Sequence, residues 1–154
     1  MAQPEQPLYL EDLQVGQVFR SGEHALDAEQ IRTFASQYDP QPFHTDEEAA
    51  RDTFFQGLAA SGWHTAAITM RLVVQSVKLA GGLIGAGTEV TWPRATRPGD
   101  VLHVESTILS VVPSRSRPDR GIVTVQSDTF NQHGELCQRS TARMLAFRRQ
   151  PELG

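Results

Sequence analysis

The sequence predicts an α+β fold in which a curved antiparallel sheet wraps one long central helix. Between residues 63 and 79, apolar side chains recur every three or four positions with few charges until Gly81-Gly82, which is typical of a helix that other parts of the protein cover. After it come four segments rich in Val, Ile, Thr, Leu and Phe and separated by Pro and Gly, which we expect to be consecutive antiparallel strands: 84–92, 100–112, 121–131 and 135–147. A long helix followed by such strands favours a sheet that packs around the helix.

Three shorter elements are expected before the long helix. An extended segment is predicted within residues 13–26. Asp27 has the type and position of an N-cap, and the helix that follows should end at Asp39, because Pro40 disfavours helical geometry in the residue before it. The pattern Thr-Asp-Glu-Glu at 45–48 resembles a capping box and should open a second short helix.

Length and composition indicate one globular domain. The 154 residues suit a single core, which we place at residues 8–149, between a loose leader at 1–7 and a tail at 150–154. No apolar run reaches the roughly 18 residues of a membrane span, and the start of the chain lacks the features of a signal peptide, so we expect a cytoplasmic protein. The net charge of −4 offers no general attraction to nucleic acid.

One segment carries a candidate acid/base pair, Asp39-Pro40-Gln41-Pro42-Phe43-His44. The two prolines should keep it stiff and non-helical, so that the Asp39 carboxylate and the His44 imidazole converge with little entropy left to lose. Histidine titrates near neutrality, as a general acid or base requires. The residue types alone leave two other readings open. In one, both side chains only satisfy backbone groups at helix ends, and in the other His44 binds a metal with Asp46, Glu47 and Glu48.

The run of residues 34–46 resembles the hydratase motif of MaoC-like proteins, the family that includes R-specific enoyl-CoA hydratases. That motif is an Asp, a turn ending in Pro, an apolar residue and His, and the likeness continues through residues 59–64, 85–93 and 97–100. The resemblance implies a hot-dog fold, normally dimeric, and a hydro-lyase that adds water to, or removes it from, a 2-enoyl or 3-hydroxyacyl thioester. It implies no metal or redox cofactor, and coenzyme A or an acyl carrier protein would enter as part of the substrate.

The resemblance also implies roles for individual residues. Asp39 and His44 would be the catalytic pair that holds the water. Backbone N–H groups of Gly62 and Trp63, at the start of the long helix, would donate to the thioester oxygen as it becomes enolate-like. Many family members have Asn at the position of Gln41 and His at that of Ser61, and these departures bear on the bracing of the loop and on substrate preference.

Several other residues are candidates for substrate contact. The candidates are Ser61, His64, Arg94, Arg97, Arg115 and Arg117. Arginine suits the phosphates of coenzyme A, and the alternative for these arginines is a solvated loop. The alternative for His64 is a packed structural histidine. Two alternative functions fit the same fold, a thioesterase and a non-catalytic acyl-CoA-binding protein. Edge strands commonly pair between subunits, so we expect a homodimer or a higher homo-oligomer.

Overall fold

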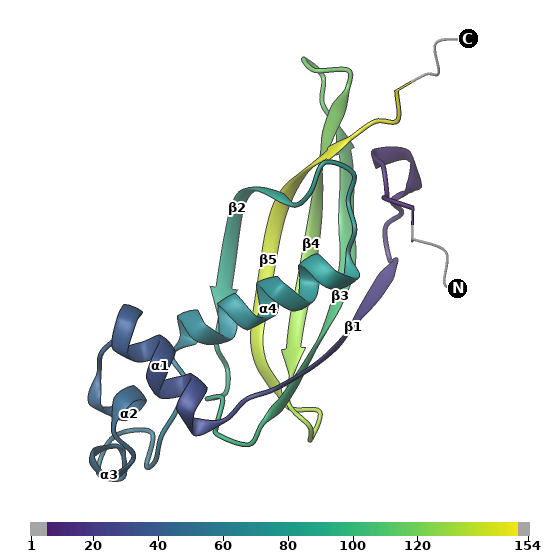
Figure 1. Ribbon diagram of the computed structural model, residues 1–154. Helices are drawn as coiled ribbons and strands as arrows, with labels where there is room; N and C mark the ends of the chain where they lie inside the picture. The colour runs from purple at the N-terminus through teal and green to yellow at the C-terminus, as the bar shows by residue number, and fades with distance from the viewer. Residues whose placement is uncertain (1–5, 151–154) are drawn as a thin grey trace.

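A five-stranded antiparallel sheet curves around the 15-residue helix α4 (Figure 1), which confirms the predicted α+β class. The computed structural model describes residues 6–150, so most of the predicted leader and tail lies outside the described residues. The elements in chain order are η1 (Leu10–Asp12), β1 (Val18–Ala25), α1 (Ala28–Tyr38), α2 (Pro42–Thr45), α3 (Glu47–Ala50), α4 (Gly62–Ser76), β2 (Ile84–Thr91), β3 (Val101–Pro113), β4 (Arg120–Phe130) and β5 (Leu136–Phe147).

The strand order is β1-β3-β4-β5-β2. The predicted meander is therefore correct for β3, β4 and β5, but the prediction that β2 precedes them in the same series is wrong. Strand β1 occupies the outer edge of β3, with Val18 opposite Thr107. The only edge left for β2 is that of β5, where Val90 lies opposite Ser140. The connection from β2 to β3 thus carries the chain from one edge of the sheet across to the other side.

Helix α4 packs on the concave face of the sheet, but one side of it stays open. Residues of β3 and β4 alternate between buried and half-buried positions, and their buried side chains form a core with Ile68, Leu72 and Val73 of α4. On the opposite side, Trp63, Met70 and Val74 are 62%, 44% and 49% exposed. The expectation that other parts of the chain cover most of the helix is thus wrong on this side. None of the helices in residues 6–150 is long and apolar enough to cross a membrane.

The end of α4 also differs from the prediction. The helix ends at Ser76, before Gly81-Gly82, and Val77 is already extended, with φ −114° and ψ 95°. The next residues join the N-terminal segment instead, because Leu8 donates to the Lys78 carbonyl and Ala80 donates to the Leu8 carbonyl, each at 2.8 Å. A contact between distant parts of the chain therefore ends the helix earlier than its local sequence indicates.

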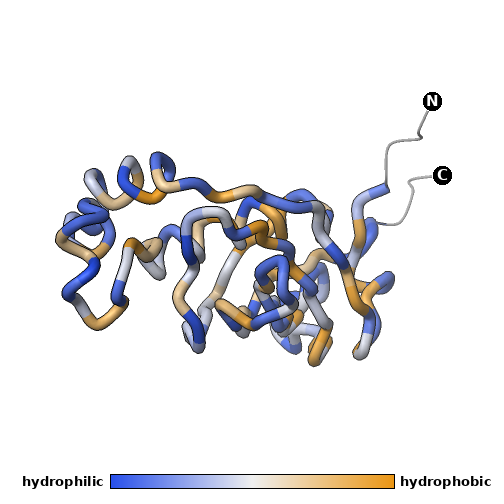
Figure 2. The backbone as a smooth tube through the Cα atoms, turned by 90° about the horizontal axis from the view of Figure 1, so that it is seen from below, coloured by the Kyte–Doolittle hydropathy of each residue, from blue (hydrophilic) through white to orange (hydrophobic). Residues whose placement is uncertain are grey.

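The short helices α1, α2 and α3 gather at one end of the molecule (Figure 1), and the view from below shows the same segment projecting beyond the sheet (Figure 2). Helix α1 begins as predicted, with Asp27 Oδ1 accepting from the Gln30 N–H at 2.8 Å. The segment predicted to be non-helical contains one helical turn, α2, because its proline stands at the first position, where a missing N–H costs nothing. The cap of α3 is Asp46 rather than Thr45, whose hydroxyl bonds within α2.

Candidate active site

Asp39 and His44 lie side by side at the junction of α1 and α2. Asp39 ends α1, where its N–H donates to the Ala35 carbonyl at 2.9 Å. One turn of α2 then brings His44 back toward it, so that His44 Nε2 lies 3.4 Å from Asp39 Oδ2. The side chain of His44 is 6% exposed and that of Asp39 is 18% exposed. The two residues that the sequence singled out are thus brought together in a partly buried position.

A backbone carbonyl fixes the orientation of the His44 ring. His44 Nδ1 lies 2.6 Å from the carbonyl oxygen of Ala59, and the Ala59 N–H donates to the Phe43 carbonyl at 3.0 Å. Because a carbonyl oxygen only accepts hydrogen bonds, Nδ1 carries a proton and donates it to Ala59. The Nε2 atom, on the other side of the ring, faces the Asp39 carboxylate.

Two donors hold the Asp39 carboxylate. The Ser61 hydroxyl donates to Oδ2 at 2.7 Å, and the Gln41 side-chain amide donates to Oδ1. Burial raises the pKa of the Asp39 carboxyl, but the hydrogen bonds from Ser61 and Gln41 and the neighbouring His44 outweigh it, so that the pKa is lowered from its ordinary value. Asp39 is therefore ionised at neutral pH. Ser61, which was predicted as a possible substrate contact, thus contacts this carboxylate in the structure.

The N-terminus of α4 points its first amides toward the same region. Ser61 caps the helix, and its Oγ accepts from the Trp63 N–H at 3.2 Å. Within residues 6–150 the N–H of Gly62 has no hydrogen-bond partner. Of the two predicted oxyanion donors, Gly62 is thus the one whose N–H is unoccupied, and the helix dipole adds partial positive charge there.

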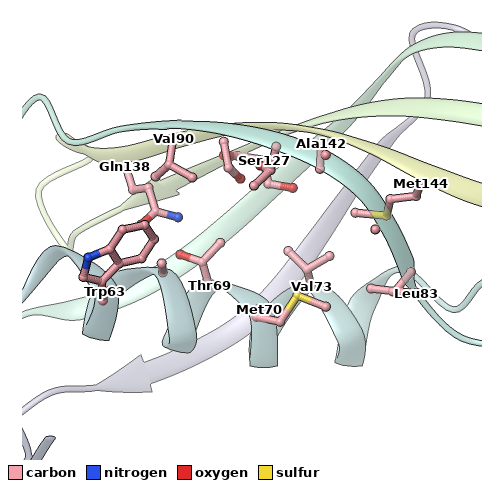
Figure 3. Close-up of a pocket in the computed structure, with 15 residues that line it drawn as sticks. Trp63, Thr69, Met70, Val73, Leu83, Val90, Ser127, Gln138, Ala142 and Met144 are labelled. Atoms are coloured by element: carbon pink, nitrogen blue, oxygen red, sulfur yellow. The ribbon is translucent and has the colours of Figure 1, made fainter. Parts of the chain in front are cut away.

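A cavity of about 270 Å³ adjoins His44. Gly62, Phe55, Trp92 and Arg94 are among the other residues that line it. A second cavity of about 420 Å³ runs between α4 and the strands β2 and β5. Figure 3 shows Trp63 and Gln138 at one end of this second cavity and Leu83 and Met144 at the other. The site thus combines a small space with polar groups and a longer apolar space next to it.

His64 faces a different part of the molecule. Its ring stacks on Phe34, with centroids 4.5 Å apart and 6° between the planes, and it lines a hollow shared with His24. Burial, with the charge of His24, lowers the pKa of His64 to about 4. Its Nδ1 is buried without a hydrogen-bond partner in the described part of the chain. His64 is therefore a neutral packed side chain and does not adjoin the Asp39–His44 pair.

The four candidate arginines are spread over the structure. Arg94 lies at the rim of the smaller cavity and forms an ion pair with Glu135 at 2.9 Å. The Arg97 guanidinium donates to the carbonyls of Phe55, Gly57 and Leu58, and so braces the loop before α4. Arg115 and Arg117 belong to the loop between β3 and β4, which lies at the far end of the sheet from α2 (Figure 1). Only Arg94 is therefore near the catalytic candidates of its own chain.

The acidic residues of the alternative metal site do not converge on His44. Asp46 Oδ1 accepts from the N–H groups of Glu48 and Ala49, and Glu47 pairs with Arg32 at 2.9 Å. Across residues 6–150 no three His, Cys, Asp or Glu side chains are grouped so that they could hold a metal ion. Asp46 thus caps the start of α3 and Glu47 forms an ion pair, as expected of acidic residues at a helix N-terminus.

Two contributors to the site were missed by the sequence reasoning. The Ala59 carbonyl leaves no trace in the identity of its residue, so no sequence signal could have found it. Trp92 was noted only within a stretch that resembles the family, although it lines the cavity and its indole N–H donates to Gln138 Oε1 at 2.8 Å.

Known proteins resemble this chain over most of its length. The family model described as MaoC like domain matches residues 11–130. The crystal structure of a MaoC-like dehydratase from Rhodospirillum rubrum is 63% identical, with a TM-score of 0.92, and the match covers 94% of this chain and 99% of that chain. The uncharacterized protein YdeM of Bacillus subtilis is 35% identical over 126 residues, which cover 80% of this chain and 87% of that protein.

A more distant structure shows the same fold. R-hydratase PhaJ1 from Pseudomonas aeruginosa is 24% identical, with a TM-score of 0.76, over 96% of this chain and 94% of that chain. The helix wrapped by an antiparallel sheet is thus the hot-dog arrangement that the resemblance predicted.

Proposed function

Because the chain belongs to the MaoC-like dehydratase family, we propose that it adds water across the C2–C3 bond of a 2-enoyl thioester, or removes it from a 3-hydroxyacyl thioester. The observation that carries the proposal is the pairing of Asp39, whose pKa is lowered, with His44, whose Nε2 lies 3.4 Å from Asp39 Oδ2 while its Nδ1 bonds the Ala59 carbonyl. In the neutral ring held this way, Nε2 would present a lone pair, and a water molecule could donate one O–H group to it and the other to the carboxylate.

In the hydration direction the water between Asp39 and His44 attacks C3 as the pair removes one of its protons. The oxygen forms the new bond to C3, the double bond becomes an enolate that spreads onto the thioester oxygen, and a proton from the pair is delivered to C2. Dehydration is the reverse. Binding of the water by two partly buried groups keeps its position fixed before the reaction.

The enolate oxygen needs hydrogen-bond donors as its negative charge develops. We assign this role to the N–H of Gly62, which is free, and which lies at the positive end of the α4 dipole. The Trp63 N–H already donates to Ser61 Oγ, so it can donate to the enolate oxygen only if that hydrogen bond breaks. Arg94, at the rim, is positioned to meet an anionic part of the carrier, coenzyme A or acyl carrier protein.

The test is turnover of crotonyl-CoA followed in two ways. Loss of the conjugated absorbance without free thiol supports hydration, whereas free thiol indicates the alternative, a hot-dog thioesterase. Asp39→Asn and His44→Ala should each lower the rate by orders of magnitude while the protein stays folded. Asp27→Asn and His133→Ala are matched controls, because asparagine also caps helices and His133 is an exposed turn residue. Activity near the wild-type level in both site variants would contradict the roles of Asp39 and His44, and no turnover by the wild-type protein would leave a non-catalytic acyl-CoA-binding protein.

We further propose that two copies of the chain associate through the open side of α4 and the edge strand β2. Trp63, Met70 and Val74 form an exposed apolar row on α4, and seven of the eight residues of β2 are exposed. An edge strand beside an apolar surface is a favourable place for pairing between subunits. Light scattering during gel filtration should give the mass of a dimer or a multiple of it. Met70→Lys should shift the mass to that of one chain, and an unshifted mass would contradict this interface.

A further inference from the structure

The two cavities are lined by neighbouring residues of the first turn of α4. His44 and Gly62 line the smaller one, and Trp63, the next residue along the helix, lines the larger one. Among the described residues none lines both cavities. We call them the catalytic cavity and the apolar chamber. The wall between them is formed by a side chain that lines one cavity and contacts residues of the other.

Trp92 forms that wall. Its ring lines the catalytic cavity, while its indole N–H donates at 2.8 Å to Gln138, a residue of the apolar chamber. The ring also meets Trp63 edge to face, with centroids 5.3 Å apart. It lies so close to Gly62 that a Cβ atom there would be 2.8 Å from Trp92 Cε2. The indole thus contacts the proposed oxyanion donor on one side and the mouth of the chamber on the other.

The chamber suits an unbranched apolar chain. Its walls include Met70, Val73 and Met144 (Figure 3), and two of its hydroxyl groups are engaged with partners outside it. The Thr69 hydroxyl pairs with Thr129 at 2.6 Å, and the Ser127 hydroxyl pairs with Ser106 at 2.9 Å. A chain that enters from the catalytic cavity would therefore meet mainly carbon atoms, which favours burial of methylene groups.

We propose that Trp92 is a specificity-determining residue that separates the catalytic cavity from the apolar chamber, so that the protein prefers short acyl thioesters and gains affinity for longer ones when the indole is removed. This inference rests on the proposed function, because it takes the occupant of the catalytic cavity to be the acyl end of a thioester. The hydrogen bond to Gln138 and the contact with Trp63 hold the indole between the catalytic cavity and the apolar chamber.

The experiment compares binding of butyryl-CoA and octanoyl-CoA, saturated thioesters that cannot be hydrated, by titration calorimetry. In the wild-type protein butyryl-CoA should bind at least as tightly as octanoyl-CoA. Trp92→Ala should raise the ratio of octanoyl to butyryl affinity at least tenfold, and up to about two-hundredfold if all of the additional methylene groups become buried. The ratio of kcat/KM for 2-octenoyl-CoA and crotonyl-CoA should rise in parallel.

Two further variants show whether a change in the affinity ratio comes from misfolding or from unspecific loosening of the structure. Trp92→Leu keeps an apolar side chain in place and should still raise the affinity ratio at least threefold, so the proposal stays testable if Trp92→Ala does not fold. Ala66 lines the apolar chamber, so Ala66→Leu added to the Trp92 variant should narrow the chamber and return the ratio toward the wild-type value.

The outcomes separate this inference from the proposed function. A folded Trp92 variant whose affinity ratio stays within twofold of the wild type would overturn the role of Trp92, whatever the activity. If the affinity ratio rises as expected while no enoyl thioester is hydrated, the barrier is supported and the proposed hydratase activity fails. If the wild type binds neither thioester, both proposals fail.

Discussion

Replacing Ser61 by alanine tests how the Asp39 carboxylate is held. The Ser61 hydroxyl has two roles, because it donates to Asp39 Oδ2 at 2.7 Å and accepts from the Trp63 N–H at 3.2 Å. The side chain is fully buried, so water cannot take its place without rearrangement. Ser61→Ala removes both hydrogen bonds and leaves Asp39 Oδ2 without this donor.

The expected loss of stability follows from these two contacts. Loss of a helix N-cap costs about 1 kcal/mol, and loss of a hydrogen bond to a charged group costs about 1.5–3 kcal/mol. We therefore expect the free energy of unfolding at pH 7 to fall by about 3 kcal/mol. Ser36→Ala is the matched control, because Ser36 is an exposed helical serine whose hydroxyl bonds only a carbonyl one turn earlier, and its loss should change stability by less than about 0.5 kcal/mol.

The pH dependence separates the two contributions. Burial still raises the pKa of Asp39 in Ser61→Ala, while one of the two side-chain hydrogen bonds that lower it is gone, so the pKa rises. In the wild type the lowered pKa stabilises the fold above the ordinary carboxyl pKa, and this contribution is lost as the pH falls through the folded-state pKa. The difference between variant and wild type should thus shrink at low pH toward the value of the cap alone. The acid limb of the rate profile should move to higher pH.

Urea unfolding across pH and a kcat/KM profile for crotonyl-CoA measure both effects. The decisive comparison is a double-mutant cycle with Asp39→Asn, in which Ser61→Ala should cost only about 1 kcal/mol, because the charged acceptor is absent. An equal cost in both backgrounds, with an unmoved acid limb, would refute the reasoning and leave Ser61 as a helix cap only.

Three further predictions address other parts of the structure. The pKa of His64 is lowered to about 4, so the free energy of unfolding should fall by about 3 kcal/mol as the pH falls from 7 to 4. His64→Leu should remove this pH dependence in urea unfolding, and a dependence that persists in the variant would assign it to another group. Arg97→Met should lower the free energy of unfolding by about 2–3 kcal/mol. Arg94→Met is the control and should lower it by less than about 1 kcal/mol, because it removes only an exposed ion pair. Equal losses in the two variants would contradict the bracing role of Arg97. Gly62→Ala should cost about 1–3 kcal/mol through its clash with Trp92, and Trp92→Leu should recover part of that cost in thermal melts.

The sequence predicted the helices and strands well where local pattern decides them. The apolar repeat after Ser61 and the alternation in β3 and β4 reflect side chains that face one core. The errors arose where distant segments meet. The end of α4 is set by the bridge to Leu8, and the position of β2 is set by the edge that β1 leaves free. Neither contact has a signature in the residues that it changes.

The candidate site shows the same division. Asp39 and His44 could be found because they are close in sequence and belong to an uncommon Pro-rich segment. Their partners Ala59 and Ser61 lie 15 and 22 positions away from them, and one of the two acts through a backbone carbonyl that every residue possesses. A candidate catalytic pair can therefore be proposed from a sequence, while the groups that fix its charge and orientation require the fold.

Gln41 shows how the departures from the family pattern are accommodated. Its backbone N–H donates to the Asp39 carbonyl at 2.8 Å, and its side-chain amide reaches back to the Asp39 carboxylate. The same residue thus closes the turn and holds the charge. A glutamine, with one more methylene group than asparagine, spans the two-residue gap from its own backbone, and Ser61 supplies the second donor from the start of α4. Both departures fall on residues that hold the carboxylate. In this chain, therefore, both departures lie in the environment of Asp39 rather than in the Asp39–His44 pair itself.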